Sequence, residues 1–211
     1  MHLTMVRETQ TETSIATPRD LFGGAMTLSL PPFFTDVSRL RGVPDNQEAF
    51  AHAETDRSLI VELLQQEHPL PVAHTLAATF HLDELASDSA ALSSNLVYSA
   101  ALPPDDFPLL KQGDPALQVS VAHGVHTVAK FKDAESLASQ VNVHLACITL
   151  PRVTTDLLVV FNDPVVLHPW GSSARVGSQV ANSQESNPER RAELFDHALR
   201  TLQVNDWSLF C

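Results

Sequence analysis

The feature that most constrains the fold is a pair of apolar segments in the second half of the chain, joined by a short link. Apolar side chains from Val141 to Leu150 occupy both phases of a strand, and residues 157–161 are apolar at every position. A strand that is apolar on both faces must be covered on both faces. The link Pro151–Thr154 is too short for a parallel crossover. We therefore expect two antiparallel neighbours inside a sheet that is covered on both sides.

The rest of the pattern adds strands and helices around this pair. Further strands are expected from apolar alternation at residues 25–30, 47–51, 95–100 and 119–131. Three helices are expected from apolar residues at helical spacing. These residues are Leu59, Ile60, Leu63 and Leu64 after a cap at Thr55 or Asp56, then Val72, Leu76 and Phe80 between Pro71 and Ser87, and finally Ala192, Phe195, Leu199 and Leu202 after Pro188. The fold class is therefore α+β, a three-layer α/β/α sandwich with a central antiparallel sheet.

Length and composition predict one folded domain. The chain has 211 residues, of which 44% are hydrophobic, and this is enough for one sizeable core. Residues 1–19 are rich in Thr, Glu and Gln and lack the apolar segment of a secretory signal, so we expect a disordered extension. Residues 168–187, rich in Ser, Gly, Asn and Gln, predict a mobile insertion. The domain is expected to span 20–211, with the tail from Val204 packed back on it.

Charge narrows the class of partner. The formal net charge is −12, and the lysines are Lys111, Lys130 and Lys132. Nucleic acid is not an expected partner because phosphate contacts need clustered Lys and Arg, and an anionic membrane surface is disfavoured for the same reason. No apolar run is long enough to span a membrane. A basic protein surface is the partner that this charge attracts. Cys147 and Cys211 make no disulfide framework, which favours an intracellular protein.

Motifs of catalysis and cofactor binding are missing from the sequence. It has no phosphate-binding Gly-rich loop, no dinucleotide fingerprint, no nucleophile elbow and no His-Glu-x-x-His helix. His123 and His126 are three residues apart on an expected strand, which points their rings to opposite faces. Cys147 is interpreted as a small buried hydrophobe. The prediction is therefore no catalytic residue, no metal site and no cofactor.

The polar loop at residues 40–48, Leu-Arg-Gly-Val-Pro-Asp-Asn-Gln-Glu, is the candidate functional segment. Pro44 fixes its own φ, and Asp45 and Asn46 favour a turn through local side-chain bonds. A polar loop between patterned elements lies at the surface. The loop is therefore expected to present Asp45 and Glu48 to solvent. Two readings stay open from the residues alone, a simple solvated turn and an acidic binding platform.

Several sequence blocks, in order, resemble one family. They are Leu21-Phe22-Gly23-Gly24-Ala25, the block from Leu40 to Glu48, the block from Ser58 to Leu64, and Thr155-Asp156-Leu157-Leu158-Val159-Val160-Phe161-Asn162, with a similar ending at Ser208-Leu209-Phe210. The chain thereby resembles the Ran guanine-nucleotide release factor family, the Mog-type nuclear import factors. The likeness is strong over residues 21–66 and 148–164 and weak over 68–140.

The resemblance implies the fold shared with the photosystem protein PsbP and a role as a regulator of a GTPase, not as an enzyme. It implies binding to the small GTPase Ran, promotion of nucleotide release, and support of nuclear import by a monomer in nucleus and cytoplasm. The partner-binding residues implied are Asp45 and Glu48, with Arg41, Asn46 and Gln47 from the same block. Two alternatives stay open: a PsbP-like structural or assembly protein without a GTPase partner, and a small-ligand enzyme that uses the histidines.

Overall fold

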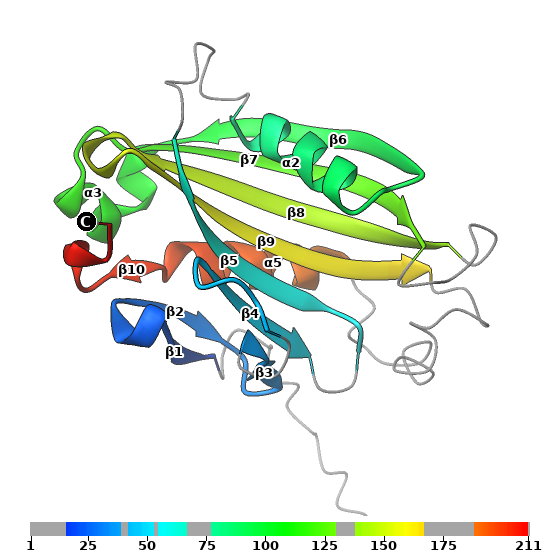
Figure 1. Cartoon of the computed structure of the whole chain (residues 1–211), viewed down its shortest axis with the longest axis horizontal. Helices are drawn as coiled ribbons and strands as arrows, with labels where there is room; N and C mark the ends of the chain where they lie inside the picture. Colours follow the sequence, from blue (N-terminus) through cyan, green and yellow to red (C-terminus); the bar gives the residue numbers. More distant parts are fainter. Residues whose placement is uncertain are drawn as a thin grey trace, which may run out of the picture.

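The structure of the chain is a computed structural model. It describes residues 16–38, 42–52, 55–66, 77–129, 138–166 and 188–210. Within these ranges the largest element is an antiparallel sheet with the strand order β3-β4-β5-β9-β8-β7-β6 (Figure 1). Its strands are β3 (Phe34–Asp36), β4 (Gln47–His52), β5 (Ser58–Gln65), β6 (Ser93–Leu102), β7 (Gln118–Val128), β8 (Ser139–Leu150) and β9 (Thr155–Val166).

The central hairpin of this sheet joins β8 to β9, and it confirms the antiparallel pair expected from the sequence. A short 3-10 turn, η5 (Pro151–Val153), closes it together with Thr154, whose φ of 48° is left-handed. Both faces of the hairpin are buried. Val159 belongs to the core cluster on one face, and Val160 belongs to the cluster on the other. Continuous apolar sequence in both strands is what this double covering requires.

The helix α2 (Ala77–Asp88) covers one face of the large sheet and packs on β6, β7 and β8. The second expected helix is thus confirmed, although the residues before Ala77, which include Val72 and Leu76, lie outside the described ranges. The prediction that Phe80 lies on the buried stripe of this helix is wrong, because the Phe80 side chain is 49% exposed. The face turned toward the sheet carries the buried Ala78 and Leu82 instead.

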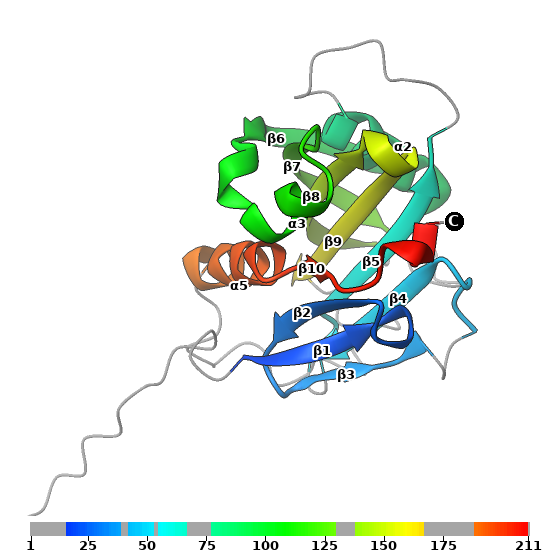
Figure 2. The same ribbon diagram turned by 90° about the vertical axis from the view of Figure 1, so that its left-hand side faces the viewer.

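The opposite face of the large sheet is covered by two helices and by a small antiparallel sheet (Figure 2). The helices are α3 (Pro108–Gly113) and α5 (Pro188–Arg200). The small sheet has the order β1-β2-β10, with β1 (Thr17–Leu21), β2 (Met26–Leu30) and β10 (Gln203–Val204). The expected three layers are present, and this outer layer is built from strands as well as helices.

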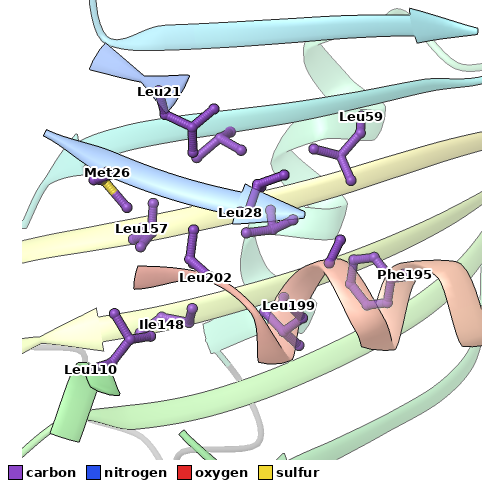
Figure 3. Close-up of a cluster of buried hydrophobic side chains, with 14 of the residues drawn as sticks. Leu21, Met26, Leu28, Leu59, Leu110, Ile148, Leu157, Phe195, Leu199 and Leu202 are labelled. Atoms are coloured by element: carbon purple, nitrogen blue, oxygen red, sulfur yellow. The ribbon is translucent and has the colours of Figure 1, made fainter. Parts of the chain in front are cut away.

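One hydrophobic cluster joins this mixed layer to the large sheet. Figure 3 shows side chains from β1, β2, β5, α3, β8, β9 and α5 meeting in it, namely Leu21, Met26, Leu28, Leu59, Leu110, Ile148, Leu157, Phe195, Leu199 and Leu202, the last just beyond α5. Burial of one such leucine side chain contributes about 1.5–3 kcal/mol. A buried ion pair, Arg191 Nη1 to Asp163 Oδ2 at 2.7 Å, also links α5 to β9. The third expected helix is confirmed, except that Ala192 is exposed and Leu194 is buried in the stripe.

The segment expected to be the first helix is the strand β5, so that prediction is wrong. Leu59 and Val61 are fully buried toward the mixed layer, and Ile60 and Leu64 pack toward α2. Residues 59, 60, 63 and 64 match a helical stripe by spacing. They match equally well a strand that is covered on both faces, which is what the sheet between two layers imposes.

The chain ends agree with the expectations only in part. Residues 17–19 belong to β1, so the expected extension 1–19 reaches too far into the domain, because Thr17–Leu21 pair with residues 26–30 of β2. The insertion expected at 168–187 lies outside the described residues. The tail packs as expected, through η8 (Trp207–Phe210), against the cluster of the mixed layer. No helix in the described ranges is both long and apolar enough to span a membrane.

Candidate functional site

The turn predicted at the polar loop is present. The backbone N–H of Gln47 donates to the carbonyl of Pro44 at 2.9 Å, which closes a four-residue turn around Asp45 and Asn46. Both central side chains are exposed. Arg41, the remaining basic candidate, lies outside the described residues. The loop therefore reaches β4 through a closed turn that displays Asp45 at its tip.

Asn46 and Gln47 tie the turn to the neighbouring strand β5. The side-chain amide of Asn46 donates to the carbonyl of Leu63 at 3.0 Å, and the backbone N–H of Leu63 donates to the carbonyl of Asn46 at 2.9 Å. The Gln47 amide donates to Glu62 Oε1 at 2.8 Å. These bonds engage the side-chain amide nitrogens of Asn46 and Gln47 within the protein. Asn46 and Gln47 thus hold the turn in place.

Glu48 is anchored differently, to a turn near the start of the domain. Its Oε1 accepts a hydrogen bond from the backbone N–H of Phe22 at 2.8 Å. Phe22 begins η2 (Phe22–Gly24), in which Phe22, Gly23 and Gly24 all have positive φ, at 50°, 68° and 94°. Glu48 is half-buried, not freely presented as expected. Two of the sequence blocks that carry the resemblance therefore meet in space at this hydrogen bond.

Asp45, in contrast to Glu48, is exposed to solvent. It makes no hydrogen bond or ion pair with any residue in the described ranges. It borders a surface hollow of about 480 Å³ that we name the acidic hollow. The carboxylates lining this hollow are Asp20, Asp36, Asp45 and Glu48, and no Lys or Arg is among its described lining residues. Such a surface attracts a basic partner.

A second hollow, of about 500 Å³, is also lined by residues of this turn, Asp45 and Asn46. We name it the apolar hollow. Its apolar lining comes from η2, β5, η5 and the C-terminal tail, through Phe22, Leu63, Leu64, Val153, Leu209 and Phe210. Apolar surface beside a charged rim is common at protein–protein contacts. Sequence reasoning missed this hollow, although Phe22, Leu209 and Phe210 stand in the blocks that carry the resemblance.

Comparison with known proteins decides the family. The family model described as "Ran-interacting Mog1 protein" matches residues 19–164. The chain belongs to the Ran-interacting Mog1 family. The Ran guanine nucleotide release factor of Danio rerio is 35% identical over 194 residues, which cover 91% of this chain and 98% of that protein. The nuclear import protein mog1 of Schizosaccharomyces pombe is 30% identical over 195 residues, covering 90% and 98%.

The Mog1 fold is also found by structure comparison. The crystal structure of the Saccharomyces cerevisiae Ran-binding protein Mog1p aligns with a TM-score of 0.64 at 24% identity, covering 93% of this chain and 98% of that one. This likeness confirms the α+β fold with its antiparallel sheets. The family model includes the strands β4 and β5 and the turn that presents Asp45. The turn at Asp45 therefore lies within the matched residues, whereas Leu209 and Phe210 of the apolar hollow lie beyond them.

The side chains of His123 and His126 lie on opposite faces of the large sheet. The His123 ring stacks on His144 of β8, with centroids 4.3 Å apart, and the His144 ring in turn lies 5.7 Å from Phe195 of α5. His126 faces the α2 side, where Leu85 lines the same pocket. The expected opposite orientation of the two rings is confirmed. Burial lowers the pKa of His126, while the nearby Asp83 opposes that shift.

Proposed function

We propose that this protein binds the small GTPase Ran and promotes release of its guanine nucleotide, in support of nuclear import. Membership of the Ran-interacting Mog1 family supports the partner, and the names of the relatives, release factor and nuclear import protein, support the activity. The observation that carries the site is the exposed carboxylate of Asp45, held on a closed turn between an acidic and an apolar hollow. The protein acts as a regulator, as a monomer, in nucleus and cytoplasm.

The mechanism rests on differential binding. A GTPase holds its nucleotide with a phosphate-binding Lys and with Mg²⁺. A partner shifts a conformational equilibrium only by its difference in affinity for the two states. Asp45 pairs with a basic group that is available when the nucleotide site is open, and the apolar hollow buries an adjacent side chain of the GTPase. Release is accelerated by binding alone, so no chemical step is needed in this protein.

The candidate residues divide into two roles in this proposal. Asp45 contacts the GTPase directly, and the closed turn fixes its direction. Glu48 contributes charge to the acidic hollow and positions Phe22 beside the apolar one. Asn46 and Gln47 position the turn through β5. Arg41, from the same sequence block, is a further candidate for contact with the GTPase.

The test is Asp45→Ala, because this exposed side chain makes no hydrogen bond or ion pair with the described residues. Isothermal titration with nucleotide-free Ran is expected to show weaker binding, by about 2–5 kcal/mol for a charge pair that is buried in the complex. Release of a fluorescent GDP analogue is expected to slow in parallel. The matched control is Asp88→Ala, an exposed acid at the end of α2. Unchanged affinity in a folded Asp45→Ala protein would overturn the site.

The same titration separates this function from the structural alternative. A PsbP-like assembly protein without a GTPase partner would not bind Ran, whether Ran carries GTP, GDP or no nucleotide. Absence of binding by the wild-type protein therefore overturns the function. Binding by the wild type that survives Asp45→Ala overturns only the site.

A further inference from the structure

Three buried side chains with metal-binding atoms meet beneath α2, and none of the three lines either hollow described above. They are His81 of α2, Cys147 of β8 and Asp156 of β9, and one ligand atom of each lies within 4.8 Å of the others. Cys147 is completely buried, and the side chains of His81 and Asp156 are 8% and 6% exposed. The three come from separate elements, so the sheet and the helix that covers it create this arrangement.

The atoms around the cluster orient its ligands. His81 Nδ1 lies 3.2 Å from Glu84 Oε2, which leaves Nε2 directed at Asp156 Oδ2, 3.4 Å away. Asp156 Oδ1 accepts hydrogen bonds from Thr149 Oγ1 at 2.7 Å and from Gln66 Nε2 at 2.8 Å. Oδ2 is thus the oxygen left facing the cluster. Metal-binding histidines usually donate the other ring N–H to a carboxylate, a backbone carbonyl or a water, and ligating carboxylates are themselves hydrogen-bonded.

A Cys–His–Asp group could also be a nucleophilic triad, and the environment of the thiol argues against that. Burial, together with the negative charge of Asp156, raises the pKa of the Cys147 thiol well above its ordinary range. The thiolate is the reactive species, and reactive cysteines are partly exposed. A substrate has no access to a completely buried sulfur. A metal ion is different, because it displaces the thiol proton when it binds.

We propose that His81 Nε2, Cys147 Sγ and Asp156 Oδ2 form a binding site for Zn²⁺. Zinc accepts nitrogen, sulfur and oxygen ligands, and its tetrahedral geometry would leave one position at this site for a water beside the three protein ligands. Tetrahedral bonds of about 2.0–2.3 Å place ligand atoms roughly 3.3–3.8 Å apart. The present separations therefore need only small side-chain movements to close around an ion.

The location gives the ion a structural role that is independent of the GTPase proposal. It links α2 to β8 and β9, which also meet through the apolar cluster of Leu82 and Val160. An ion that binds the native state and not the unfolded chain raises stability by mass action. Metal binding should therefore raise the melting temperature of the protein without changing its affinity for Ran.

The experiment is a titration of the reduced, metal-free full-length protein with Co²⁺ as a spectroscopic substitute for Zn²⁺. One equivalent of Co²⁺ is expected to give a sulfur-to-cobalt charge-transfer band and the visible bands of a tetrahedral ion, and Zn²⁺ should remove both. Cys147→Ser is expected to abolish the charge-transfer band. Cys211→Ser, which removes the other cysteine of the chain, is the matched control and should leave the spectrum unchanged.

A second variant keeps the test decisive if Cys147→Ser fails to fold. Glu84 is 53% exposed and orients the His81 ring, so the Glu84→Gln protein should fold normally. Its affinity for Zn²⁺ should be about 10- to 100-fold lower than that of the wild type. The proposal is overturned if folded wild-type protein gives no thiolate charge-transfer band. It is also overturned if Cys211→Ser removes the band, or if Glu84→Gln binds Zn²⁺ with unchanged affinity.

Discussion

The carboxylate of Glu48 accepts a 2.8 Å hydrogen bond from the backbone N–H of Phe22, a residue 26 positions earlier in the chain. Phe22 has a φ of 50°, a left-handed value that residues with a Cβ rarely adopt. The bond therefore connects a strained turn of the mixed layer to the first residues of β4. Because Phe22 also lines the apolar hollow, Glu48 determines the shape of the proposed contact surface.

Glu48→Ala is expected to lower the free energy of unfolding by about 0.5–1.5 kcal/mol, the net contribution of a typical hydrogen bond, because the bond to Phe22 is part-buried. Chemical denaturation of the full-length protein measures this loss. Asp45→Ala is the matched control, since an exposed side chain without internal partners changes stability by no more than about 0.5 kcal/mol. Equal stabilities of the two variants would remove Glu48 from its positioning role.

Association with Ran is expected to accelerate at low ionic strength. The protein carries a formal charge of −12, and the screening length is about 8 Å at physiological salt. Stopped-flow association rates should fall as salt is added, and Asp45→Asn should make that dependence shallower than Asp88→Asn does. Rates of the wild type that are constant across salt concentrations would exclude electrostatic steering at the acidic hollow.

Gly113→Ala is expected to displace the C-terminal tail. A Cβ at Gly113 would lie 1.9 Å from Cζ2 of Trp207, whose ring packs 5.6 Å from that of Phe210. Overpacking of this kind costs about 1–3 kcal/mol. In a Trp170→Phe background, the fluorescence of Trp207 should shift to the red. Gln112→Ala, an exposed neighbour in α3, should leave the emission unchanged. An unshifted spectrum in Gly113→Ala would show that the tail is not held there.

The sheet could be predicted where sequence spacing leaves one solution. The short link between Leu150 and Thr155 permits only an antiparallel pair, and that pair is present. The spacing of Leu59, Ile60, Leu63 and Leu64 permits a one-sided helix or a two-sided strand, and choosing between them requires knowledge of the layers on either side. The local sequence pattern does not report which layers cover a segment, and for this reason the helix predicted at residues 59–64 is in fact the strand β5.

The candidate site likewise has a part that could be predicted from the sequence and a part that could not. The closed turn at Asp45 follows from Pro44 and from the turn preference of Asp and Asn, and it could be predicted. The bond from Phe22 to Glu48 joins residues far apart in sequence, so no local signal reports it. Phe22 and Glu48 meet because the fold brings η2, the turn between β1 and β2, next to β4.

Acid is expected to destabilise the protein through His144. Burial, and then the charge of the stacked His123, lower the pKa of His144 to about 4. The pKa of a histidine in the unfolded chain is about 6.5. Between these values the unfolded chain binds a proton that the native state excludes. The contribution of neutral His144 to the free energy of unfolding is therefore fully present above about pH 6.5. It is lost as the pH falls toward about 4, and the loss amounts to up to about 3 kcal/mol.

Denaturation of wild type and His144→Leu between pH 4 and 7.5 tests this assignment. The variant should lose most of the slope, because leucine keeps the apolar contact with Phe195 and binds no proton. A smaller slope of the same sign should persist, since burial also lowers the pKa of His126. His197→Leu, a half-buried histidine of α5 outside the stacked pair, is the control and should retain the wild-type profile. Parallel profiles for wild type and His144→Leu would assign the acid sensitivity to other groups.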